Sequence, residues 1–228
     1  MGNLRIALAT VALAVGVGAS CCLAQDAPVS VDADGTPGME RSDSAAAQIS
    51  DTVRVTILHS NDVYGTLQRQ GSGDDSTGGM APRVHLIRGL QAGGPTVVLD
   101  AGDALGPETL SAWDQGKAMV AAMRLAGYAA MVPGNHDFGH GPAALTQRAD
   151  EAGFPFLAAN VKGKGQTDLP LESYLLVEAG PVRIGIVGLA SPGIAKQTNP
   201  RHVEGLEFGN PAKAGGDAVR ALLEQGAQ

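Results

Sequence analysis

The chain has 228 residues, of which 44% are hydrophobic and 17% are charged, so it can form one sizeable folded domain and is not a wholly disordered chain. Its net charge of −7, without a marked Lys/Arg cluster, excludes a nucleic-acid-binding protein that works through a basic patch. If the ligand is a phosphate, bound cations must supply the attraction, because the protein itself is acidic.

The first 24 residues have the pattern of a secretory signal peptide. Arg5 is positively charged, Ile6 to Val17 form an apolar core, and the small Ala24 marks the expected cleavage site. We therefore predict export to the periplasm or the extracellular space, with no membrane span after the leader is removed. A lipid anchor at Cys21 or Cys22 is the alternative, and an uncleaved membrane anchor is a third. Because both cysteines lie in the leader, we expect no disulfide in the mature chain.

Strand and helix patterns alternate from residue 52 onward. Residues 25–51 lack periodicity and are rich in Asp, Ser, Gly, Pro and Ala, which is typical of a flexible linker. In chain order we then predict a strand at 52–59, a polar loop at 66–78, a helix at 80–91, a strand at 95–100, a helix at 116–126, a strand at 128–132, a helix at 141–151, strands at 155–161, 172–178 and 182–189, and a helix at 211–225. This alternation predicts an α/β fold built in layers.

Polar residues directly follow each of the first three predicted strands. The first strand leads to Asp62, the second to Asp100 and Asp103, and the third to Asn135 and His136. Because strand carboxyl ends in an open α/β sheet point into one crevice, we expect these groups to lie close together, with one of the paired carboxylates behind the other. Carboxylate and amide oxygens indicate a divalent metal site, and a neighbouring imidazole can donate to a phosphoryl oxygen. Each of these three polar segments, taken alone, is also typical of an ordinary turn.

A series of sequence blocks occurs in the order and at the spacing of a known family. The blocks are Ile57-Leu-His-Ser-Asn-Asp62, Gly78-Gly-Met-Ala81, Asp100-Ala-Gly-Asp103, Ala126-Gly-Tyr128, Gly134-Asn-His-Asp-Phe138, Phe154-Pro-Phe-Leu-Ala-Ala-Asn160 and Ile184-Gly-Ile-Val-Gly-Leu189. From about Thr52 to Leu189, the chain therefore resembles the calcineurin-like metallophosphoesterases, and within them the exported 5′-nucleotidase type. The resemblance implies a layered α/β sandwich, with residues 52–228 as the N-terminal part of a domain that is truncated at its C-terminus.

The resemblance also implies a site with two divalent metal ions, which could be Mn, Zn, Mg, Ca or Fe. It assigns Asp62 to one metal, Asp103 to a position that bridges both, and Asn135 to the second metal. It assigns His136 to the phosphoryl transition state or the leaving group. Two such ions would hold the phosphate, lower the pKa of a bound water and neutralise charge during in-line attack. The implied substrate is a small phosphoester, such as a nucleotide.

Two positions depart from the family pattern. The family has Asp-x-His at the first strand end, where this chain has Tyr64, and it has an Asp three residues after the catalytic His, where this chain has Gly139. Asp137 is a candidate for the missing partner of His136. The family also supplies later histidines from a Gly-His-x-His-like element, whereas only His202 follows His140 here.

Two hypotheses follow from this mixture of matches and departures. The first is a metal-dependent phosphoester hydrolase, with weak or no activity in this chain alone because much of the expected ligand set is missing. The second is a non-catalytic exported protein, or a lipoprotein, that keeps the fold and binds a metal or phosphate ligand. The substrate, the metal and the oligomeric state stay open at this stage.

Overall fold

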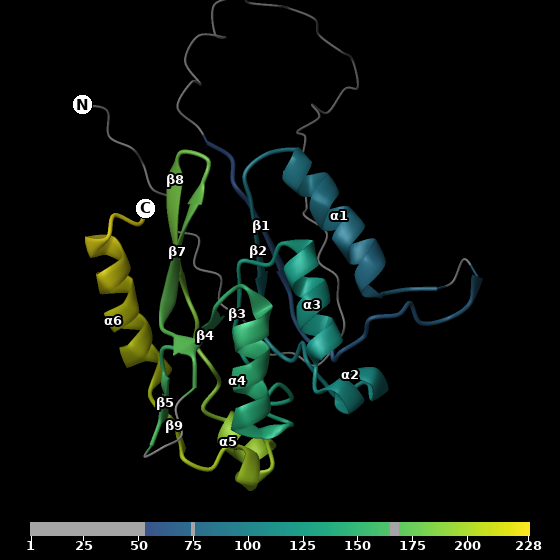
Figure 1. The fold of residues 1–228 in the computed structure, drawn as a ribbon. Coiled ribbons are helices and arrows are strands. Elements are labelled where there is room, and N and C mark those ends of the chain that lie inside the picture. The colour runs from purple at the N-terminus through teal and green to yellow at the C-terminus, as the bar shows by residue number, and fades with distance from the viewer. Residues whose placement is uncertain (1–52, 74–75, 165–168) are drawn as a thin grey trace, which may run out of the picture. The chain divides into compact units, whose positions relative to one another are not determined.

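A computed structural model describes residues 53–73, 76–164 and 169–228 (Figure 1). The predicted signal peptide and linker, at 1–24 and 25–51, lie outside the described residues. No helix among the described residues is long and apolar enough to cross a membrane.

The main sheet has five parallel strands in the order β1-β2-β3-β4-β6. They are β1 (Thr56–Ser60), β2 (Thr96–Asp100), β3 (Ala130–Met131), β4 (Phe156–Leu157) and β6 (Leu171–Glu172). Val97 and Val98 of β2 are both buried although they point to opposite faces, as expected for a strand of a parallel sheet covered on both sides. The predicted α/β class is therefore confirmed.

The register of the sheet places the ends of its first three strands side by side. Ser60 of β1 lies opposite Asp100 of β2, and Asp100 lies opposite Met131 of β3. All three strands run in the same direction, so the loops that follow them leave the sheet at one edge. This edge carries the polar residues that the sequence analysis selected.

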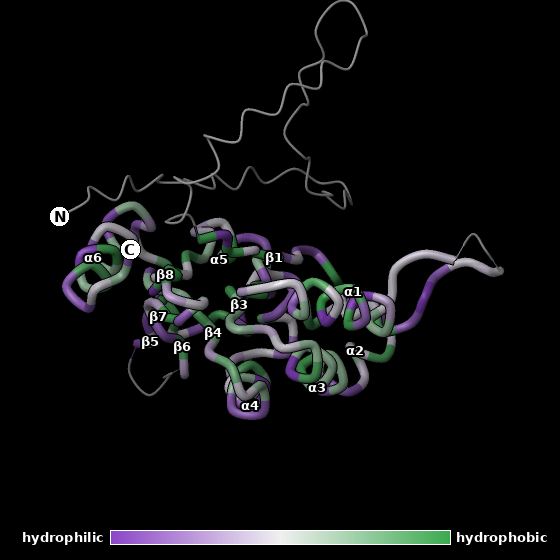
Figure 2. Tube along the Cα trace, turned by 90° about the horizontal axis from the view of Figure 1, so that it is seen from above, coloured by the Kyte–Doolittle hydropathy of each residue, from purple (hydrophilic) through white to green (hydrophobic). Residues whose placement is uncertain are grey.

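Within the described residues, six α-helices surround the strands (Figures 1 and 2). They are α1 (Met80–Ala92), α2 (Thr109–Asp114), α3 (Lys117–Ala126), α4 (Gly141–Ala152), α5 (Ile194–Gln197) and α6 (Pro211–Glu224), and η2 (Pro200–His202) is a short 3-10 helix. Helix α3 packs against α1 and α4, and it buries Met119, Val120 and Met123 at helical spacing. With Phe138, Phe156 and Leu105, these side chains form the centre of the core.

Two small antiparallel sheets complete the described part. Strands β7 (Tyr174–Ala179) and β8 (Val182–Val187) form a hairpin on which α6 packs, and β5 (Val161–Gly163) pairs with β9 (Leu206–Phe208). The predicted single strand at 155–161 is wrong in its extent. It is split into β4 and β5 because the chain leaves the parallel sheet after Leu157 and pairs with β9 instead.

Candidate active site

The loops after β1 and β2 are held together beyond the ends of the strands. The N–H of Asp62 donates to the carbonyl oxygen of Gly102 (3.0 Å), and the N–H of Tyr64 donates to that of Asp103 (2.8 Å). Asp62, Tyr64 and Asp103 all have left-handed backbone, with φ of 54°, 52° and 57°. Burial raises the pKa of Asp103, and the nearby negative charge of Asp62 adds to this rise. The backbone hydrogen bonds thus hold the loops that carry Asp62 and Asp103 together.

The loop after β3 contacts the Asp103 carboxylate through its backbone. The N–H of His136 donates to Asp103 Oδ1 at 2.8 Å. Gly134 lies so close that a Cβ at this position would overlap the Asp103 carboxylate. Glycine is thus the residue that allows the third loop to approach. The structure brings Asp62, Asp103 and the Asn135–His136 segment together at one edge of the sheet.

Asn135 and His136 differ in what they contact. The backbone carbonyl of Asn135 accepts a hydrogen bond from Thr198 Oγ1 (3.0 Å), while its side-chain amide has no hydrogen bond within the described residues. The ring of His136 lies edge-on to that of Tyr64, with centroids 5.2 Å apart and an interplanar angle of 85°. Both rings line a shallow hollow of about 320 Å³, together with Thr66, Gln70, Pro107 and Glu108.

Asp137 has a different role from the one considered in the sequence analysis. Its side chain is only 3% exposed, and both of its oxygens accept backbone N–H groups, those of Asp103 (2.8 Å), Leu105 (2.8 Å) and Gly134 (2.7 Å). Burial raises its pKa to about 7, while the three N–H groups act in the opposite direction. Asp137 thus binds the backbone of two loops, and it is not arranged as an imidazole partner.

Asp100 lies behind the site, as expected for one of the two carboxylates on β2. Its Oδ2 accepts the hydroxyl of Ser60 (2.6 Å), its Oδ1 accepts the N–H of Gly102 (2.9 Å), and Ser60 Oγ also lies 2.7 Å from the hydroxyl of Tyr128. Burial raises the pKa of Asp100 to about 7. This network holds the ends of β1 and β2 and the residues before β3 together beneath the candidate ligands.

Known proteins match this chain in both sequence and structure. The chain is 30% identical over 190 residues to protein UshA of Escherichia coli, a match that covers 81% of this chain and 33% of the relative. It is also 30% identical over 179 residues to the 5′-nucleotidase of Vibrio cholerae, covering 76% of this chain and 32% of the relative. The crystal structure of a 5′-nucleotidase precursor from Thermus thermophilus matches with a TM-score of 0.70 at 29% identity, over 76% of this chain and 35% of that one.

The chain belongs to the 5′-nucleotidase family. Its fold is that of the calcineurin-like phosphoesterases, since it also matches the calcineurin-like phosphoesterase YfkN of Bacillus subtilis with a TM-score of 0.65 at 20% identity, over 76% of this chain and 59% of that one. No protein-family model matches the chain. It spans about a third of the length of its curated 5′-nucleotidase and UshA relatives.

The donor groups of this 5′-nucleotidase family member fit part of a divalent-metal site. The carboxylates of Asp62 and Asp103 and the amide of Asn135 are hard oxygen donors, which suit ions such as Mg²⁺ or Mn²⁺. Within the described residues, no group of three or more His, Cys, Asp or Glu side chains is placed to hold a metal ion. Tyr64 places a phenol where the family pattern has an imidazole, and burial and the charge of Asp62 raise the pKa of this phenol.

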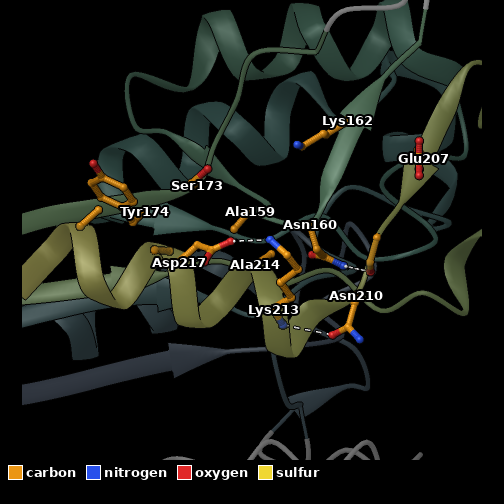
Figure 3. Close-up of a pocket in the computed structure, with 13 residues that line it drawn as sticks. Ala159, Asn160, Lys162, Ser173, Tyr174, Glu207, Asn210, Lys213, Ala214 and Asp217 are labelled. Atoms are coloured by element: carbon orange, nitrogen blue, oxygen red, sulfur yellow. Dashed lines mark hydrogen bonds and ion pairs between the residues drawn. The ribbon is translucent and has the colours of Figure 1, made fainter.

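A larger hollow of about 550 Å³ lies between α6, β5 and β9, and it contains none of the predicted site residues (Figure 3). Lys213 and Asp217 form an ion pair there (3.0 Å), and the Asn210 side chain accepts the backbone N–H of Lys213 at the start of α6. Lys162, Ser173 and Glu207 also line this hollow, and none of the polar groups there was selected in the sequence analysis. In this 5′-nucleotidase family member, the chemistry-bearing side chains gather at the strand ends.

The sequence analysis missed two kinds of supporting residue. Ser60 and Tyr128 are 68 positions apart and show no local pattern that would join them to Asp100. Thr198 lies 63 positions after Asn135, in a segment where no element had been predicted. Among the supporting residues, Asp137 could be noticed in the sequence, because it directly follows His136 in the motif Gly134-Asn-His-Asp-Phe138.

Proposed function

We propose that this chain contributes the N-terminal part of a metal-dependent phosphoesterase site that hydrolyses 5′-nucleotides or related phosphomonoesters and diesters. The observation that carries this proposal is the hydrogen-bonded assembly of Asp62, Asp103 and His136 at the ends of three parallel strands. The substrate class is supported by the names of the 5′-nucleotidases to which the chain is similar.

The proposed roles are those that the resemblance to the family implies. Asp62, Asp103 and Asn135 would hold the divalent ions through their side-chain oxygens. Divalent ions bound there would lower the pKa of a bound water and neutralise phosphate charge. The imidazole of His136 lines the hollow beside Tyr64, where it can donate a hydrogen bond to a phosphoryl oxygen. It can also give a proton to the ester oxygen that leaves when the P–O bond breaks.

The same proposal divides the chain into a leader, a linker and a phosphoesterase part. Residues 1–24 would direct export and be removed, residues 25–51 would act as a linker, and residues 52–228 would carry the phosphoesterase part. The place of action would be the periplasm or the extracellular space, or a membrane surface if Cys21 or Cys22 carries a lipid.

A non-catalytic member of the family is the second candidate, and Tyr64 favours it. A protonated phenol stands where the family pattern has a metal-binding imidazole, and Gly139 stands where it has a carboxylate. Such a protein would keep the fold and bind one metal ion or a phosphate ligand without turning it over.

Turnover separates the two candidates. The full chain with Mn²⁺ is assayed on bis(p-nitrophenyl) phosphate, p-nitrophenyl phosphate and AMP, and we expect slow hydrolysis of at least one of them. Asp103→Asn should lower kcat/KM by at least about 100-fold, because it removes charge from the bridging position. Asp150→Asn, an exposed change on α4, is the matched control and should leave kcat/KM unchanged. Mn²⁺ binding without any turnover would favour the non-catalytic candidate.

A further inference from the structure

Asp137 connects the loops that carry two of the candidate metal ligands. Its Oδ2 accepts the N–H of Asp103 and the N–H of Gly134, and its Oδ1 accepts the N–H of Leu105. Asp103 is itself a candidate ligand, and Gly134 immediately precedes another. One carboxylate therefore binds the backbone of both loops that carry these candidate ligands.

A second hydrogen bond runs in the opposite direction. Asp103 Oδ1 accepts the N–H of His136, which belongs to the same loop as Asp137. Each of the two carboxylates thus accepts backbone N–H groups from the other's loop. Hydrogen bonds from N–H groups to a buried carboxylate are short and strong, so this pair restrains the separation of the two loops more than one neutral hydrogen bond would.

We propose that Asp137 is a positioning residue for the candidate metal site. Its three hydrogen bonds fix the backbone of Asp103 relative to that of Gly134, and through it the placement of Asn135. This inference rests on the proposed function, since it concerns the residues assigned there as ligands. It predicts that the loops carrying Asp103 and Asn135 already have their final backbone arrangement in the metal-free protein.

Asp100 offers a matched comparison, because it is the other deeply buried carboxylate at the same strand end. It accepts one N–H, from Gly102, and one hydroxyl, from Ser60, and neither belongs to the loop after β3. In Asp100→Asn the amide oxygen can accept the N–H while the amide nitrogen donates to the hydroxyl oxygen. In Asp137→Asn, by contrast, the amide nitrogen must face an N–H donor, because all three partners of Asp137 are donors.

Hydrogen exchange in EDTA tests the restraint without any metal. In Asp137→Asn we expect the amides of Leu105 and Gly134 to exchange at least about ten-fold faster than in the wild type, while amides in α1 and α3 keep their rates. In Asp100→Asn the same two amides should stay within about two-fold of the wild type. Unchanged exchange at both amides in Asp137→Asn would overturn the inference.

Mn²⁺ binding, followed by the EPR signal of the free ion at 25 °C, tests the consequence for the site. We expect the Kd of Asp137→Asn to rise at least about ten-fold and that of Asn210→Ala, which removes the cap of α6, to stay within about two-fold, a difference that general destabilisation would not produce. Equal Kd values for Asp137→Asn and the wild type would also overturn the inference. If the wild type binds no Mn²⁺, the proposed function fails, while the exchange rates still decide whether Asp137 restrains the loops.

The wild type alone provides a safeguard if Asp137→Asn does not fold. The N–H groups of Leu105 and Gly134 donate to Asp137 and lie outside helices and strands. Slow exchange of both amides in the metal-free wild type would support the inference. Exchange at the rate of an unprotected loop would contradict it.

Discussion

At the residue scale, the candidate site depends on uncommon backbone conformations. Left-handed backbone costs a residue with a side chain about 1–2 kcal/mol, and Asp62, Tyr64 and Asp103 all adopt it within the two adjoining loops. Aspartate tolerates this region better than most residues, and the backbone hydrogen bonds between the loops offset part of the cost. Such a concentration of strain is typical of functional sites.

Gly134 gives the first prediction at this scale. Gly134→Ala would place a methyl group against the Asp103 carboxylate, so we expect a loss of about 1–3 kcal/mol in the free energy of unfolding. Gly89→Ala is the control, because a Cβ there meets no atom within 4 Å. Since Gly89 lies inside α1, alanine should stabilise the protein by about 0.5–1 kcal/mol. Urea unfolding measures both, and equal effects of the two changes would refute the steric argument.

At the element scale, loops and helix ends decide how well each strand end is held. The pairing of β1 with β2 continues past Ser60 through successive backbone hydrogen bonds to the loop after β2. The loop after β3 has no such ladder, and it is held instead by side chains such as those of Asp137 and Thr198. The first two candidate ligands, Asp62 and Asp103, are therefore placed by backbone hydrogen bonds, whereas the placement of the third, Asn135, depends on particular side chains.

Helix α6 gives a prediction about an element remote from the site. The Asn210 side chain accepts the N–H of Lys213 (3.1 Å) and caps the helix, and Pro211 follows at its first position. Asn210→Ala removes this cap and should lower the free energy of unfolding by about 0.5–2 kcal/mol. Asn210→Ser keeps a capping oxygen and should stay within about 0.5 kcal/mol of the wild type in the same denaturation experiment. A full loss in the serine variant would assign the effect to another contact.

At the scale of the whole molecule, a buried carboxylate should make stability depend on pH. Burial raises the pKa of Asp100 to about 7, whereas an aspartate in the unfolded chain has a pKa of about 3.9. Between these pH values the folded chain keeps protons that the unfolded chain has lost. Stability should therefore fall as the pH rises from about 4 to about 7.

Asp100→Asn tests this contribution. The variant has one titrating carboxylate fewer, so its stability should fall less over the same pH range than that of the wild type. Urea unfolding in EDTA at about pH 4 and about pH 8 measures the difference, because both conditions lie near the ends of the expected change. Parallel pH dependence of the variant and the wild type would show that Asp100 is ionised in the folded state.

The sequence predicted the centre of the site better than its surroundings. Asp62, Asp103 and His136 could be selected because each follows an apolar strand, and parallel strands bring their ends together whatever the rest of the chain does. The role of Asp137 could not be predicted from the sequence, because it depends on the orientation of its side chain within a turn. Helix α2 was missed because its six residues are too short to show a helical period, and Leu110 and Trp113 on it are exposed.

The left-handed backbone at position 64 has a consequence for how this gene can change. Codons for tyrosine and histidine differ by a single base, so one transition in the first codon position would convert Tyr64 to His and restore the Asp-x-His pattern. Histidine is found in left-handed backbone more readily than most residues, whereas a bulky tyrosine is an outlier there. The main chain at position 64 thus suits histidine better than tyrosine, and a single nucleotide change would place the imidazole of the family pattern there.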